Sequence, residues 1–305
     1  MIGIIIGSVF LGLIILFLIF LFIVYKLYFY TPVKGQNDEY NFGGIMKLLG
    51  KGEIVKMVDK LLNIPYQDLY TKSYDGLKLH GYFYENKNSN QYVLLFCGFR
   101  CSSRRDYCAR ALDLIESGRN VILCDQRGHG LSEGHTITLG RKEQHDVVSW
   151  VKFIQEKFGK DARITVVGAS FGATTVLLAS DKLPPEVKVF ADGAYPSQKA
   201  IIRHILKRKK LNPNIYWPIV YLTALIYGHV HLKDDAAINV GKSKCQIMMV
   251  HCTKDTIVPL EMNQKLFEAN KETAQVVLFE NQQHAMAYFK EREKYKKIFF
   301  DFLDK

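Results

Sequence analysis

The residues best suited to covalent chemistry form a Gly-Ala-Ser-Phe-Gly pentapeptide at 168–172. It lies between a strand-like run at 164–167 and a helix-like run at 171–181, which predicts a sharp strand-to-helix turn. The flanking glycines let the backbone bend so that the serine oxygen is exposed, and the helix N-terminus favours a developing oxyanion. Ser170 is therefore a candidate nucleophile. The alternative is a tight turn in which this serine only caps the helix.

A nucleophilic serine needs a base and an orienting acid, which in this arrangement follow in the chain order Ser, Asp, His. Asp255 lies in the loop after a strand-like run at 246–251, and His284 lies in the loop after the last strand-like run. We therefore predict Asp255 as the acid and His284 as the base. Asp192, which ends an earlier strand-like run, is a rival acid. The alternatives are a helix-capping aspartate and a surface histidine.

The remaining histidines fit the role of base less well. His129 lies in an Arg-Gly-His-Gly segment that indicates a packed turn, whereas His204, His229 and His231 lie in a predicted insertion. None of them pairs with a suitably placed later acid.

Stabilising an oxyanion requires two backbone N–H groups, one from the residue after the nucleophile and one from the loop after an early strand. Phe171 follows Ser170 directly. Phe99 follows a Cys-Gly pair at the end of a strand-like run at 92–96, where glycine permits a turn. The N–H groups of Phe99 and Phe171 are the predicted donors.

Strands and helices alternate along most of the chain, which predicts a mostly parallel, doubly wound sheet of the α/β class. The first two strands are predicted to form a hairpin about Asp75 and Gly76. The strand-like runs lie at 69–73, 77–84, 92–96, 120–124, 164–167, 187–191, 246–251 and 275–279. The helix-like runs lie at 104–117, 141–158, 171–181, 260–270 and 287–303.

The segment 198–240 interrupts this alternation. A basic run at 203–210 precedes an apolar, aromatic run at 216–227, and we predict an inserted helical cap over the carboxyl edge of the sheet. The basic run is a candidate contact with anionic lipid; the alternative is a solvated helix face.

The N-terminal segment is apolar enough to span a bilayer. No charged residue occurs from Ile2 to Tyr25, and nineteen of these positions are Ile, Leu, Val or Phe. Their insertion free energies sum to the order of −6 to −11 kcal/mol. A cleaved secretory signal is the alternative, but no basic residue precedes the segment and no Ala-x-Ala-like site follows it. We predict an anchor at 1–25, a juxtamembrane linker and helix near the bilayer at 26–65, and a catalytic domain at 66–305.

Charge and cysteine content bear on location and partners. Lysines follow the anchor, so the positive-inside rule predicts a cytoplasmic catalytic domain, and six cysteines without a disulfide-like spacing agree with this. The net charge of +11 is spread along the chain without a nucleic-acid motif, which favours an anionic membrane surface over nucleic acid. Gly3 and Gly7 form a small-xxx-small pair, a candidate for a weak homodimer.

These motifs together resemble the α/β-hydrolase superfamily and, within it, membrane-anchored bacterial serine hydrolases similar to serine-aminopeptidase-like enzymes. The likeness covers about 69–303. The matching segments are at 97–99, 125–132, 168–172, 192–195, the loop that contains Asp255, and 283–286. The resemblance implies hydrolysis through an acyl-enzyme, with Ser170 attacking, His284 moving the proton and Asp255 orienting the imidazole. It implies no metal and no organic cofactor.

The function we predict is a carboxylic ester hydrolase acting on a small-molecule or lipid-like acyl substrate, because an aromatic cap and a bilayer lie close to the site. Amide or peptide hydrolysis remains open, since the same three residues cleave either bond. A membrane-bound binding module that keeps the fold without the chemistry is the non-enzymatic alternative.

Overall fold

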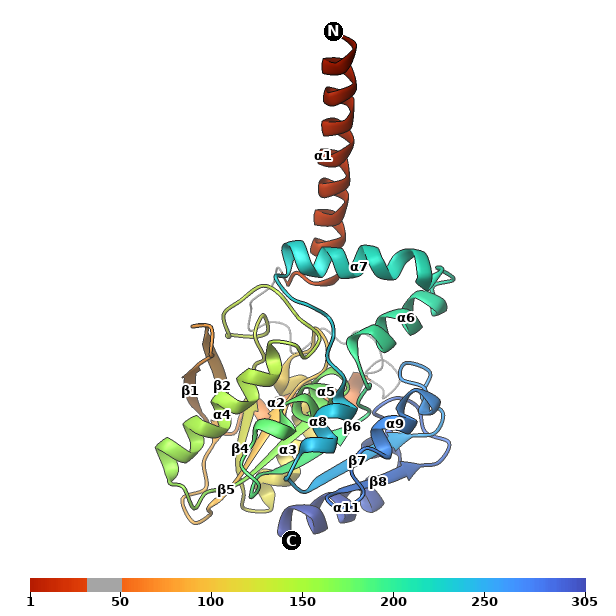
Figure 1. Cartoon of the computed structure of the whole chain (residues 1–305). Coiled ribbons are helices and arrows are strands. Elements are labelled where there is room, and N and C mark those ends of the chain that lie inside the picture. Colours follow the sequence, from red (N-terminus) through yellow and green to blue (C-terminus); the bar gives the residue numbers. More distant parts are fainter. Residues whose placement is uncertain (32–50) are drawn as a thin grey trace.

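The computed structural model describes residues 1–31 and 51–305 (Figure 1). Within these ranges eight strands form one sheet in the order β1-β2-β4-β3-β5-β6-β7-β8. β1 and β2 are antiparallel to their neighbours, whereas the pairs from β4 to β8 are parallel. The strands are β1 (Gln67–Lys72), β2 (Lys78–Tyr84), β3 (Gln91–Phe96), β4 (Asn120–Cys124), β5 (Arg163–Ala169), β6 (Lys188–Asp192), β7 (Ile247–Cys252) and β8 (Ala274–Phe279).

Helices cover both faces of the sheet, because its central strands are apolar on both sides. In β3, Leu94 and Phe96 belong to one apolar cluster, whereas Val93 and Leu95 belong to the other. The first face is covered by α4 (Glu143–Phe158), α5 (Phe171–Ala179) and α8 (Ala236–Lys242). The second is covered by α2 (Lys51–Leu62), α3 (Ser103–Glu116), α10 (Ala287–Lys290) and α11 (Arg292–Asp304). The predicted doubly wound α/β fold is confirmed, with each predicted strand within two residues at either end.

Two predicted helices differ from the structure. The run at 260–270 contains only the 3-10 turn η4 (Leu260–Asn263) and α9 (Gln264–Phe267). Asn270 ends it, because its side chain donates to the Val240 and Ser243 carbonyls and accepts from the following backbone amides. The run at 287–303 is divided into α10 and α11 at Glu291.

The predicted insertion at 198–240 forms α6 (Gln198–Arg208), α7 (Pro213–Tyr227) and the start of α8. α6 and α7 form an arm between the body and the N-terminal helix (Figure 1). The N-terminal half of α6 contributes Ile201 to a cluster with Phe171, beside the predicted nucleophile. α8 differs from the arm, because it packs on α5 within the helical layer.

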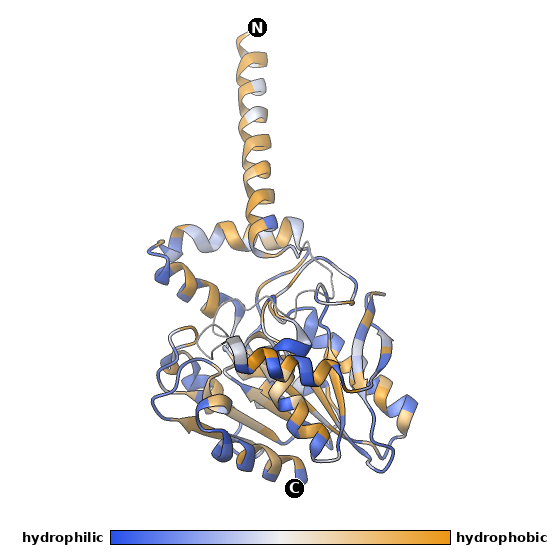
Figure 2. Ribbon diagram, turned by 180° about the vertical axis from the view of Figure 1, so that it is seen from behind, coloured by the Kyte–Doolittle hydropathy of each residue, from blue (hydrophilic) through white to orange (hydrophobic). Residues whose placement is uncertain are grey.

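The N-terminal helix α1 (Ile2–Tyr28) is long and apolar enough to cross a membrane, and hydrophobic residues occupy almost its whole length (Figure 2). It contains the predicted span at 2–25. Residues 32–50 of the predicted juxtamembrane segment lie outside the described ranges. The rest of that segment includes α2, which buries Ile54, Val58 and Leu61 in the body of the protein.

The end of α1 is joined to the body by backbone hydrogen bonds. Tyr30 forms an isolated antiparallel bridge with Thr136. The Thr31 N–H donates to the His135 carbonyl at 2.8 Å, and the Ile137 N–H donates to the Phe29 carbonyl at 2.9 Å. Phe29 is 2% exposed. The chain at 29–31 is therefore an integral part of the body.

Candidate active site

Ser170 occupies a strained turn between β5 and α5. Its φ of 54° and ψ of −113° lie in a region that side chains with a Cβ rarely adopt, and such strain is concentrated at functional sites. A Cβ added to Gly168 would lie 2.2 Å from the Gly172 carbonyl carbon, and one added to Gly172 would lie 1.9 Å from the Phe96 carbonyl oxygen. Only glycine at both positions lets β5, α5 and the end of β3 approach this closely.

The three predicted catalytic side chains come together at this turn. The imidazole Nε2 of His284 lies 2.8 Å from the Ser170 Oγ, and its Nδ1 lies 2.5 Å from Oδ2 of Asp255. Since a carboxylate only accepts hydrogen bonds, the proton of the neutral ring belongs on Nδ1. Nε2 is then free to accept the proton of the serine hydroxyl.

The Asp255 carboxylate is held by its own loop. Its Oδ1 accepts hydrogen bonds from the backbone N–H groups of Ile257 and Val258, both at 2.8 Å. Its side chain is buried, so Oδ2 is directed at His284 without competition from bulk water. The carboxylate therefore fixes the plane of the imidazole.

Asp192, the rival acid, points elsewhere. Its Oδ2 accepts from the Arg110 guanidinium and from the Tyr295 hydroxyl, which lie on α3 and α11. Only its backbone contributes to the turn, since the Asp192 carbonyl accepts the Ser170 N–H at 2.7 Å. The carboxylate near the imidazole is thus that of Asp255.

The two predicted oxyanion donors lie on adjacent loops. Phe171 begins α5, and Phe99 follows β3; their rings meet edge to face with centroids 6.3 Å apart. Among the described residues, neither backbone N–H has a hydrogen-bond partner. Unpaired N–H groups beside Ser170 suit a developing negative charge.

Comparisons with known proteins concern the fold and the segment that contains Ser170. The family model described as serine aminopeptidase, S33, matches residues 87–195, which include the Ser170 turn. The solved structure of the Pyrococcus furiosus esterase Pf2001 is similar, with 26% identity and a TM-score of 0.66 over 80% of this chain and 92% of that chain. This chain has the α/β-hydrolase fold.

Two curated relatives match a smaller share of the chain than this structure does, and the chain spans about two thirds of their length. The Bacillus subtilis protein YqkD is 26% identical over 196 residues, and the match spans 62% of this chain and 64% of the length of YqkD. A Saccharomyces cerevisiae protein described as a membrane protein is 25% identical over 208 residues, or 67% of this chain and 68% of that protein.

Arg100, in the loop of the predicted oxyanion donor Phe99, links the candidate site to α1. Its guanidinium Nη2 donates to the carbonyls of Leu27 at 2.9 Å and Tyr30 at 3.0 Å. Its backbone N–H donates to Nε2 of His129 at 3.2 Å. The end of α1 therefore helps to hold the loop that carries Phe99. Sequence reasoning missed Arg100, because no local pattern reveals a partner more than seventy residues away.

His129 also holds the loop that carries Phe99 and Arg100. Its ring stacks on Phe171 with centroids 6.1 Å apart, and its Nδ1 lies 3.0 Å from the Arg127 carbonyl. Burial lowers the pKa of His129, which keeps the ring neutral. Nδ1–H then donates to that carbonyl, and Nε2 accepts from Arg100. The packed turn predicted here thus positions a predicted oxyanion donor.

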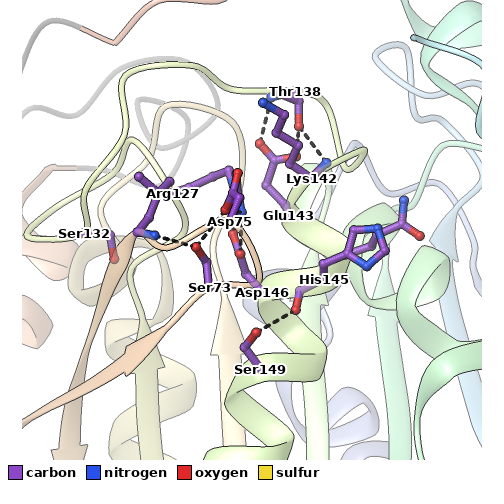
Figure 3. Close-up of polar contacts among 12 residues, drawn as sticks. Ser73, Asp75, Arg127, Ser132, Thr138, Lys142, Glu143, His145, Asp146 and Ser149 are labelled. Carbon is purple, nitrogen blue, oxygen red and sulfur yellow. Dashed lines mark hydrogen bonds and ion pairs between the residues drawn. The ribbon is translucent and has the colours of Figure 1, made fainter. Parts of the chain in front are cut away.

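A polar network fixes the segment that carries His129 (Figure 3). The Arg127 guanidinium donates to both oxygens of Asp146 and to both oxygens of Asp75, at 2.6–3.0 Å. Farther along, the Glu143 carboxylate accepts the backbone N–H and the hydroxyl of Thr138. The β1–β2 turn, this loop and α4 are thereby held together on one side of the site.

Proposed function

We propose that this protein is a membrane-anchored carboxylic ester hydrolase that works through Ser170, His284 and Asp255. The observation that carries the proposal is the continuous chain of hydrogen bonds from the Ser170 hydroxyl through His284 to the buried Asp255 carboxylate. The strained backbone of Ser170 and the free N–H groups beside it support the same reading. The similarity to an esterase supports the ester over other acyl substrates.

The reaction has two steps. As the Ser170 oxygen attacks the ester carbonyl carbon, its proton passes to Nε2 of His284. The tetrahedral oxyanion accepts hydrogen bonds from the N–H groups of Phe99 and Phe171. Collapse breaks the bond to the alcohol, which leaves with the proton from His284.

Water completes the cycle. It loses a proton to His284 and attacks the acyl-serine, and the second tetrahedral intermediate releases the carboxylic acid while Ser170 regains its proton. Asp255 stays ionised throughout and stabilises the imidazolium that forms in each step.

A fluorophosphonate probe tests the proposal, with full-length protein in detergent because residues 29–31 belong to the body. We expect the parent to be labelled and to hydrolyse p-nitrophenyl acyl esters. We expect Ser170→Ala to abolish labelling and to lower kcat on the order of 10⁶-fold. Ser149→Ala, on α4, is the matched control and should label like the parent. Labelling that survives Ser170→Ala would place the nucleophile elsewhere, and an unlabelled, folded parent would favour a binding module.

Amide hydrolysis is the second candidate, favoured by the description of the matching family model. Aminoacyl-coumarin amides, assayed beside the esters, separate the two. A higher kcat/KM on the amides than on every ester would replace the ester assignment.

A further inference from the structure

Helix α7 has an unusual surface for a helix outside a protein core. None of its fifteen residues is charged, yet only Thr223 and Ala224 are buried. Ile215 is 61% exposed and Tyr216 is 36% exposed. A helix that is apolar on all sides is normally enclosed by a protein core or by lipid.

The position of α7 indicates what encloses it. In both ribbon views α7 lies crosswise at the base of α1, between that helix and the body (Figures 1 and 2). The two helices contact each other directly: the ring of Tyr227 lies 5.4 Å from that of Phe22 and 5.9 Å from that of Tyr25. A membrane that holds α1 therefore meets α7.

One hydrogen bond sets the depth of α7. The Tyr227 hydroxyl donates to the Leu18 carbonyl at 2.9 Å. A spanning helix needs about 20 apolar residues. Counted from Ile2, these end at Leu21; counted back from Tyr25, they begin at Ile6. Leu18 lies inside the span in either case, so the C-terminal end of α7 reaches the acyl chains.

The residues around this contact are those that proteins place at a bilayer surface. α7 carries Tyr216, Trp217, Tyr221 and Tyr227, and Trp and Tyr are enriched where acyl chains meet headgroups. At the end of the preceding helix, the Lys209 ammonium lies 3.4 Å from the Tyr28 hydroxyl. This cation, with the exposed lysines next to it, lies at the level where α1 leaves the membrane.

We infer that α7 is a second membrane-binding element, a helix that lies in the bilayer surface with its aromatic side chains among the acyl chains. The inference rests on the membrane anchoring in the proposed function but not on its chemistry. Its partner is the lipid bilayer. With α1 upright and α7 flat, the protein is fixed in one orientation, and the arm that leads to Phe171 through α6 meets the membrane directly.

Tryptophan quenching tests this directly, because the chain has two tryptophans and Trp150 is 1% exposed in the core. Full-length protein is reconstituted into phosphatidylcholine vesicles brominated either near the headgroup or near the bilayer centre. We expect the parent to lose emission, more with the shallow bromines than with the deep ones. We expect Trp217→Phe, which leaves only Trp150, to lose none.

A third variant, Phe17→Trp in the Trp217→Phe background, reports whether α1 is inserted. Quenching of this anchor reporter, together with quenching of Trp217 in the parent, supports the inference. Quenching of the anchor reporter alone would mean that water or a second copy covers α7, which overturns the inference and leaves the anchor in place. Loss of neither signal would overturn the anchor and the inference together, and neither outcome affects the chemistry assigned to Ser170.

Discussion

Asp192 and Asp255 are both buried aspartates at the carboxyl edge of neighbouring strands, yet their surroundings are opposite in kind. Asp255 faces the His284 imidazole, which gains and loses a proton in the proposed reaction. Asp192 faces the Arg110 guanidinium, which keeps its charge, and a tyrosine hydroxyl. The first carboxylate is placed to act in a reaction, whereas the second closes an ion pair inside the protein.

The backbone explains the difference. Asp192 is still part of β6, where Phe190 packs on the layer of α11. Since side chains two residues apart on a strand point to the same face, Asp192 is directed to that layer too. Asp255 lies in the loop after β7, where alternation no longer applies and two backbone N–H groups aim its carboxylate. The loop after β7 turns the Asp255 carboxylate toward His284, whereas the end of β6 directs Asp192 away from it.

Removing the charge of Asp255 should have the largest effect on activity. Asp255→Asn keeps an oxygen for the Ile257 and Val258 amides but presents an NH₂ donor to His284, which favours the wrong tautomer. We expect kcat for p-nitrophenyl esters to fall about 10⁴-fold, with the thermal unfolding midpoint nearly unchanged. An unchanged kcat would show that another group orients the imidazole.

The same substitution at Asp192 should affect stability instead. Asp192→Asn leaves the buried Arg110 charge uncompensated, which costs about 3–5 kcal/mol. We expect a lower denaturation midpoint but near-parental kcat in the folded fraction. The matched double variant, Arg110→Met with Asp192→Leu, removes both charges and should be less destabilised than Asp192→Asn. If Asp192→Asn lowered kcat without lowering the denaturation midpoint, Asp192 would again be a candidate for the catalytic acid.

Substitution of Asp75, which is partly exposed, should have the smallest effect on stability. Unlike the effects at Asp255 and Asp192, we expect this one to depend on pH. Burial raises the pKa of Asp75, but the hydrogen bonds from Arg127 and Ser73 outweigh it and lower the pKa to about 2. Because the folded pKa is below the ordinary value, this stabilisation is present above about pH 4 and is lost as the pH falls toward 2. Asp75→Asn should therefore be less stable than the parent at neutral pH, with a gap that narrows on acidification. Unfolding midpoints at a series of pH values measure it, and a constant gap would contradict the assignment.

The sequence predicts the sheet well, and it selects three side chains that the structure brings together. Short apolar runs such as the one that contains Val93–Leu95 indicate buried strands. Ser170, Asp255 and His284 each follow a strand, and the ends of parallel strands lie at one edge of the sheet. Sequence order favoured Asp255 but left Asp192 as a rival acid, because the choice depends on which face of the sheet a side chain meets. Arg100 and His129 were missed as positioning residues, because their partners lie far away in the chain. The shortened helix at 260–270 depends on Asn270 bonding to the end of α8.

The junction between α1 and the body has a mechanical consequence. A flexible linker between α1 and the rest of the protein would let the domain rotate freely above a membrane and expose each of its sides to the lipid in turn. Here the backbone pairs at 29–31 and the Arg100 guanidinium hold the helix end firmly to the domain. For a protein anchored as proposed, the domain can rotate only about the long axis of α1, which lies along the membrane normal. Its distance from the bilayer surface therefore stays constant. Ser170 then stays at one height above the membrane surface. The protein therefore meets a substrate held in the lipid by diffusing in two dimensions.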